Sequence, residues 1–137
     1  MERRDYLIHQ IQEMGAFLAR LILRLQKKEV QPSAEIASVA HELEDELGFK
    51  LNDLLFLDNA AFIELVQEKL LADENMEQFA VLLEQLGDVA LEDETFLRQQ
   101  IYYRKAMELL VFVDRNSQSY SMQRQQRIVT IRTKLNA

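Results

Sequence analysis

The histidines are the first candidates for chemistry in this chain, and there are two of them, His9 and His41. A zinc site of the His-Glu-x-x-His type needs a second histidine four residues on, but Asp45 stands at that distance from His41. A di-iron helical bundle needs a glutamate three residues before each histidine, where this chain has Tyr6 and Ser38. Neither site fits, so we predict no metal and no other cofactor.

Other catalytic patterns are also missing from the sequence. No glycine-rich phosphate loop precedes a lysine, and the absence of cysteine excludes thiolate chemistry and fits a reducing, cytoplasmic location. Ser117, Ser119 and Ser121 read as caps and turn residues. The acidic run 42–46 lacks the alternating oxygen ligands and central glycine of a calcium loop, which favours a solvated helix face. We therefore predict no catalytic residues and a protein that is not an enzyme.

The charge of the chain is distributed unevenly. The net charge is -7, but residues 1–28 carry +3, residues 29–97 carry -16 and residues 98–137 carry +6. One interpretation is that the basic ends fold back against the acidic middle. The other is that they form a basic surface that meets an anionic partner.

One candidate for such a surface combines basic and aromatic residues. Arg98, Tyr102 and Lys105 are spaced to share one helix face, and Arg124 and Arg127 follow on the next predicted helix. Basic residues with an aromatic among them are typical of nucleic-acid binding, although the overall acidity disfavours that partner. Tyr102 could instead lie at the edge of the core with its hydroxyl in water.

The composition predicts an all-α protein. Three glycines and one proline in 137 residues leave few turns for a β-rich fold, and the length suits a single helical domain over residues 1–137. We expect about six helices in antiparallel pairs. After the first helix, we place them from Ser33 to about Leu47, from Asp58 or Asn59 to about Leu71, from Asp73, from Asp93 to about Asp114, and from Ser121 onward. Residues 49–57 are predicted to form a short helical turn or loop packed into the core.

Residues 1–28 are predicted to form one long amphipathic helix. Its apolar positions follow the spacing 4-3-4-3-4, which is typical of a helix that packs on another helix; they are Leu7, Ile11, Met14, Leu18, Leu21 and Leu25. If the chain does not cover this seam itself, we expect it to pair with a second copy as a homodimer. The alternative is a helix lying on an anionic membrane, which Glu13 disfavours.

The stretch 80–113 resembles a tetratricopeptide helix pair. Its small residues Gly87 and Ala106 are 19 positions apart, the separation that brings two such helices into close contact. Gln99 departs from the pattern, which wants a small residue there, and Val111 stands where proline is frequent. The resemblance implies a right-handed stack of antiparallel helix pairs, and the alternative is an irregular helical bundle.

Several segments spread over the whole chain also resemble a known family. The segments Arg4–Ile8, Gly48–Leu55 and Tyr103–Leu110, with a closing basic helix, are similar to an uncharacterised family of small all-helical bacterial proteins. This resemblance implies a bacterial, tetratricopeptide-like protein and transfers no active site.

These observations favour a non-catalytic interaction or adaptor module. A groove between its helices would take a peptide or a helix of a protein partner. The alternative is a peripheral binder of anionic membrane or nucleic acid that uses its basic N- and C-terminal helices.

Overall fold

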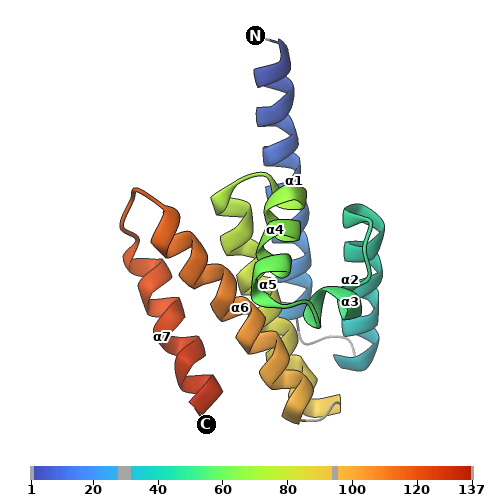
Figure 1. The fold of residues 1–137 in the computed structure, drawn as a ribbon. Coiled ribbons are helices and arrows are strands. Elements are labelled where there is room, and N and C mark those ends of the chain that lie inside the picture. Colours follow the sequence, from blue (N-terminus) through green and yellow to red (C-terminus); the bar gives the residue numbers. More distant parts are fainter. Residues whose placement is uncertain (1, 28–31, 94–95, 137) are drawn as a thin grey trace.

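The computed structural model describes residues 2–27, 32–93 and 96–136, which contain seven helices and no strand (Figure 1). The predicted all-α class is confirmed. One helix more than expected is present, because the segment 49–57 contains a short helix of its own. The helices are α1 Glu2–Gln26, α2 Pro32–Leu47, α3 Leu51–Leu55, α4 Asn59–Leu70, α5 Asp73–Asp93, α6 Phe96–Asn116 and α7 Met122–Asn136.

Local sequence signals set several helix ends. Asp58 caps α4 by accepting a hydrogen bond from the Ala61 N–H at 2.8 Å, as predicted. Gly48 follows α2 with φ of 77° and donates its N–H to the Glu44 carbonyl at 2.9 Å, also as predicted. The predicted start at Asp93 is wrong, because α5 continues through that residue and α6 begins at Phe96.

Helix α5 is the centre of the molecule. It packs against α1, α2, α4 and α6, and α7 packs along α6 (Figure 1). The chain reverses direction between α5 and α6 and again between α6 and α7, so these three helices run antiparallel in succession. Helices α1 and α2 pack against α5, and α3 and α4 also contact α6.

The α5–α6 contact depends on a small residue. Gly87 on α5 and Ala106 on α6 lie on helices that pack together, as predicted, and Ala106 is fully buried. A Cβ at Gly87 would lie 2.7 Å from Tyr103 Cε1, closer than real Cβ atoms approach, and a tight 3.1 Å from Tyr102 Cβ. The Gln99 side chain donates a hydrogen bond to the Gly87 carbonyl at 2.9 Å, which gives this departure from the tetratricopeptide pattern a structural role.

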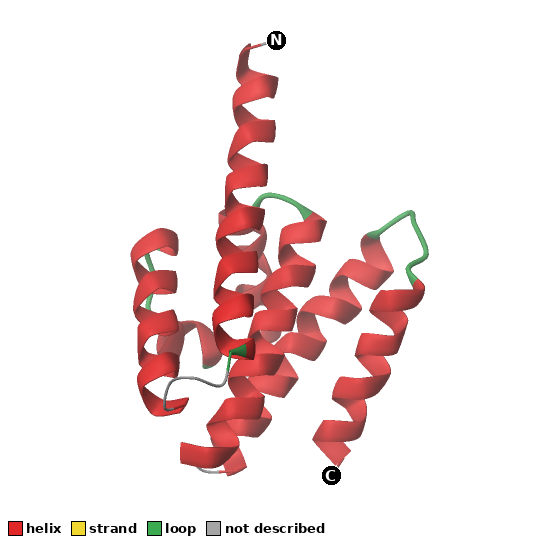
Figure 2. Ribbon diagram, turned by 180° about the vertical axis from the view of Figure 1, so that it is seen from behind, coloured by secondary structure: helices red, strands yellow, loops and turns green. Residues whose placement is uncertain are grey.

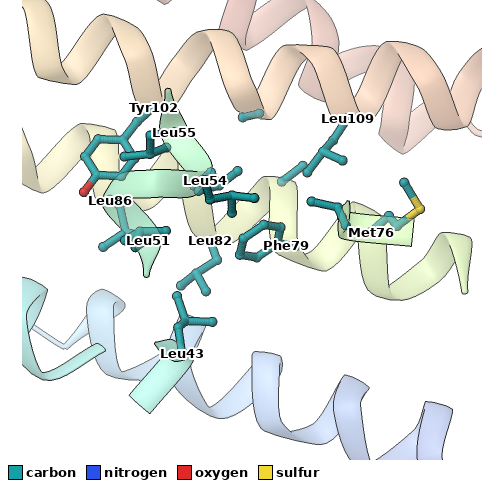
Figure 3. Packing of buried hydrophobic residues seen from close by; sticks show 14 of the residues in the cluster. Leu43, Leu51, Leu54, Leu55, Met76, Phe79, Leu82, Leu86, Tyr102 and Leu109 are labelled. Atoms are coloured by element: carbon teal, nitrogen blue, oxygen red, sulfur yellow. The ribbon is translucent and has the colours of Figure 1, made fainter. Parts of the chain in front are cut away.

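All seven helices contribute buried side chains to one core, and Figure 3 shows its central part. Short α3 contributes Leu51, Leu54 and Leu55, all buried, so the expectation that residues 49–57 pack into the core is confirmed. Phe79 of α5 is fully buried beside them. Further buried side chains around this group include Leu43, Leu82, Leu86, Tyr102 and Leu109.

Helix α1 has two halves with different surroundings. Its C-terminal half packs on α5 and buries Leu18 and Leu21. Its N-terminal half projects beyond the other helices in both views (Figures 1 and 2), and residues 3–10 are all exposed. The predicted seam is therefore not available as a whole: Leu18 and Leu21 are covered by the protein itself. Intermediate exposure is found at Ile11, Met14 and Leu25, and Leu7 is exposed.

Within the described part of the chain, every helix is too short or too polar to cross a membrane.

Candidate functional site

The five residues of the predicted basic surface lie in two separate places. Arg98, Tyr102 and Lys105 do share a face of α6, but that face packs toward α3 and the start of α4. Arg124 and Arg127 lie on α7 and turn toward α5. The two groups therefore do not meet on one surface.

Lys105 is a buried structural residue, with its side chain 7% exposed. Its ammonium donates to the Leu57 carbonyl at 2.5 Å and to Glu108 Oε2 at 3.1 Å. It also lies 4.8 Å from the ring centroid of Phe62, so a cation–π contact adds to these bonds. A lysine can bury its stem in this way when its charged end finds partners.

Tyr102 is fully buried in the core, and its expected position at the core edge is therefore wrong. Arg98 lies over its ring at 5.6 Å and donates through Nη1 to Asn52 Oδ1 at 2.8 Å. Arg98 thus covers the tyrosine and ties α6 to α3.

Arg124 joins three segments although its side chain is only 6% exposed. It donates to Glu77 Oε1 at 2.7 Å, to Asp114 Oδ1 at 3.0 Å and to the Ser119 carbonyl at 2.8 Å. The bond to Glu77 is the main reason that the pKa of Arg124 is raised. Hydrogen bonds from Arg124 and Gln125 lower the pKa of Asp114.

A second polar cluster holds the other end of α7. Lys134 Nζ lies 2.6 Å from Glu84 Oε2 and 3.0 Å from Asp88 Oδ1, and Tyr103 donates to Asp88 Oδ1 at 2.6 Å. Burial lowers the pKa of Lys134, but the bonds to both carboxylates outweigh it and the net pKa is raised. Burial, and then the bond to Asp88, raise the pKa of Tyr103 above its usual range. Arg127 adds a contact to Glu84 at 3.5 Å.

The prediction of a basic interaction surface is thus wrong for three of its five residues, which are buried. The charge asymmetry is instead used inside the molecule, where α7 pairs with α5 and with Asp114 of α6. At the other end of the chain, Arg24 of α1 pairs with Glu35 and Glu42 of α2. These contacts show that the basic C-terminal end and Arg24 fold back against acidic segments, whereas Arg3, Arg4 and Arg20 of the basic N-terminal end are exposed.

The structure contains a groove that the sequence did not locate. It lies open to solvent between α4 and α6 and has a volume of about 740 Å³. Its large apolar side chains are buried or half-buried, whereas most of its charged lining is exposed. The large apolar residues are Ile63, Met107, Val111 and Phe112, with the exposed Ala60 at the edge, and the charged ones are Glu64, Arg104, Glu108 and Arg115.

A signal for this groove was present in the sequence. Helix α6 is apolar on two sides, and we expect such a helix to be sandwiched between neighbours. Helix α5 covers one side, but the short α4 covers the other only in part, which leaves Met107 and Phe112 at half exposure. The periodicity of this stretch indicates the second apolar side but carries no information on how much of it a neighbour covers.

The histidines lie on exposed helix faces. His9 contacts Glu13 at 2.8 Å on α1, and His41 contacts Asp45 at 3.4 Å on α2. Among the described residues, no group of three or more histidine and carboxylate side chains is placed to hold a metal ion.

No protein-family model matches the chain, and neither a curated protein nor a solved structure gives a match. The groove between α4 and α6 and the projecting half of α1 therefore stand on their own geometry as candidate sites.

Proposed function

We propose that this protein is a non-catalytic interaction module that binds an amphipathic helix of a partner protein in the groove between α4 and α6. The groove itself carries the proposal. Its apolar strip of Ile63, Met107, Val111 and Phe112 is suited to the apolar face of a helix. A methionine in the strip helps because its flexible thioether adapts to different side chains.

The charges beside this strip indicate the chemistry of the partner. Arg104 and Arg115 are exposed at the two ends of the α6 side, eleven residues apart, which is roughly 16 Å along a helix. Glu108 between them is engaged by Lys105. The partner helix would therefore carry acidic residues about three turns apart on the flank that faces α6, and a basic residue opposite the exposed Glu64 of α4.

A tetratricopeptide-like arrangement of α5, α6 and α7 belongs to the same proposal. The antiparallel succession of these helices and the close crossing at Gly87 support it. In such proteins stacked helix pairs present grooves to extended or helical ligands.

The experiment is a titration of the full chain, followed by backbone amide NMR, with a synthetic 16-residue helical peptide. The peptide carries leucines at i, i+3, i+4 and i+7 and two glutamates eleven residues apart. We expect shifts concentrated at Ile63, Val111 and Phe112. A scrambled peptide of the same composition should produce none of them. Equal shifts with both peptides, or shifts elsewhere, would contradict the proposal.

Two sets of variants sharpen this test. Val111→Glu places a carboxylate on the apolar strip and should weaken binding at least tenfold, whereas Leu97→Glu, at an exposed position of the same helix, should leave it unchanged. The double variant Arg104→Glu, Arg115→Glu should lose the acidic peptide and gain a version in which both glutamates are lysines. If the double variant binds the acidic and the basic peptide with the affinities of the wild type, the proposed orientation of the partner is wrong.

A further inference from the structure

Helix α7 lies at one edge of the molecule in both views, and the loop 117–121 joins it to α6 (Figures 1 and 2). Its 15 residues include four basic side chains and no acidic one. In its described part, Ile128 and Ile131 are the buried apolar side chains, whereas Met122 and Val129 are 65% and 58% exposed. A helix with so narrow an apolar face gains little from hydrophobic packing.

The contact between α7 and α5 is incompletely packed. Two hollows that are open to solvent lie between these helices, with volumes of about 330 and 280 Å³. The larger one is lined in part by Val81 of α5 and Leu110 of α6, and Gln123 of α7 lines both. The α5–α6 face beneath α7 therefore keeps apolar surface that this polar helix leaves unfilled.

The same face holds α7 through carboxylates at fixed intervals. Glu84 is the most buried of them, with its side chain 9% exposed, so a helix that covers it must bring a cation. Counting Arg124 as position 1, α7 offers basic residues at positions 1, 4 and 11 and apolar residues at positions 5 and 8. The ion pairs join Glu77 to Arg124, Glu84 to Arg127 and Lys134, and Asp88 to Lys134.

We infer that α7 is a displaceable cover and that the α5–α6 face beneath it is a second recognition surface, which takes a basic amphipathic helix of another protein. The incoming helix repeats the basic and apolar positions of α7. It competes with α7 by placing a further apolar side chain where Gln123 stands, toward the hollow that Val81 and Leu110 line. A second copy of this chain would offer the same α7, which leaves the same hollows unfilled and gains nothing over the tethered helix. The surface is distinct from the groove between α4 and α6, so the inference does not rest on the proposed function.

Native-state hydrogen exchange of the full chain tests whether α7 opens on its own. We expect the amides of α7 to exchange together and roughly a hundredfold faster than the buried amides of α5, because a helix that detaches as a unit opens at a lower cost than the whole fold. High salt should raise the rate for α7 more than for α5, since screening weakens the ion pairs of α7. Equal protection of the two helices would overturn the inference, because α7 would then leave only when the whole chain unfolds.

A fluorescent peptide tests what binds to the face. It has the sequence of residues 121–137 with leucine in place of Gln123. Because the tethered α7 competes at an effective concentration on the order of millimolar, the peptide should bind the wild type weakly. The double variant Arg127→Gln, Lys134→Gln removes the two cations that reach Glu84 and should bind roughly tenfold more tightly, since a larger fraction of it is open. The matched control Arg132→Gln, at an exposed position of α7, should bind as the wild type does.

The location of binding and the kind of partner are checked with the same proteins. Backbone amide NMR should place the peptide-induced shifts at Glu84 and Leu110, and a peptide with glutamates at positions 1, 4 and 11 should bind neither variant. Equal affinity of the double variant and of Arg132→Gln would overturn the inference, as would shifts at Ile63 and Val111, which would show binding in the groove. The double variant without peptide should sediment as a monomer. A dimer would show that a second copy supplies the helix and would overturn the assignment to another protein.

Discussion

Helix α5 is bound on two sides by different kinds of chemistry. Toward α6 the contact is close and mostly apolar, with Gly87 against Tyr103 and the fully buried Ala90 and Ala106 nearby in the core. Toward α7 the link is made by long charged side chains, such as Arg124 reaching Glu77. The comparison shows how an acidic chain can hold a basic final helix without presenting a large basic surface. It also predicts that the two sides respond differently to substitution.

The largest loss of stability is expected in the apolar core that surrounds α5. Phe79→Ala, at a fully buried position of α5, should lower the free energy of unfolding by about 3–5 kcal/mol because it leaves a cavity in the core. Urea denaturation measures this difference. Leu97→Ala, at a 68% exposed position, is the control and should change it by less than about 0.5 kcal/mol. Similar losses for both variants would contradict the assigned core.

A substitution on the α7-facing, polar side of α5 should lower the free energy of unfolding by a smaller amount. Arg124→Met keeps an apolar stem but removes the charge-assisted bonds to Glu77 and Asp114, and we expect a loss of about 1.5–3 kcal/mol. The same substitution at the exposed Arg132 of α7 is the matched control. High salt should weaken the wild type more than Arg124→Met, because screening acts on the pairs that the variant lacks. An equal salt response in both proteins would show that these pairs do not hold α7.

A substitution at Gly87 tests how closely α5 and α6 approach each other, and its expected effect on stability is intermediate in size. In most helices Gly→Ala is stabilising by about 1 kcal/mol. Here the added methyl meets Tyr103, and the overpacking cost of about 1–3 kcal/mol should make Gly87→Ala destabilising by about 1 kcal/mol. Thermal and urea unfolding both measure the sign. A stabilised variant would show that α5 and α6 are not in tight contact at this position.

The smallest effect is expected at the hydrogen bond between Tyr103 and Asp88. Tyr103→Phe should cost about 0.5–1.5 kcal/mol at neutral pH. The pKa of Tyr103 is raised in the folded protein above its ordinary value of 10.0. The protonated phenol therefore contributes its full stabilisation of the fold below pH 10.0, and this stabilisation is lost as the pH rises above 10.0. Unfolding measured between pH 8 and 11 should therefore show a shallower alkaline decline in Tyr103→Phe. The control Tyr120→Phe, at an exposed position, should decline as the wild type does.

The helices could be predicted from the sequence because their signals are local. Asp58 and Gly48 mark helix ends through contacts with residues only three or four positions away. The 4-3-4-3-4 spacing located α1, but the spacing is the same where α5 covers the helix and where nothing in the described chain does. The end of the covered part depends on where Asn75 meets Ile11, a contact between segments 64 residues apart.

The candidate sites were harder to predict because they depend on which helices become neighbours. The periodicity of α6 correctly placed Arg98, Tyr102 and Lys105 on one face, but a periodic pattern does not identify the helix that covers that face. Lysine and arginine add to the difficulty, since both can bury long apolar stems when their charged ends are paired. The groove was difficult to predict for the same reason, because its volume depends on how far α4 extends along α6.

The hydrogen bond from Gln99 to the Gly87 carbonyl has a consequence for how uniquely the chain folds. Apolar ridges on two helices can slide by a turn and still pack acceptably, whereas a buried amide has its acceptor at only one longitudinal offset. A shifted pairing of α5 and α6 would leave that amide unsatisfied at a cost of about 1–3 kcal/mol. Gln99 therefore selects a single alignment of α5 and α6 among the several that apolar packing alone would permit.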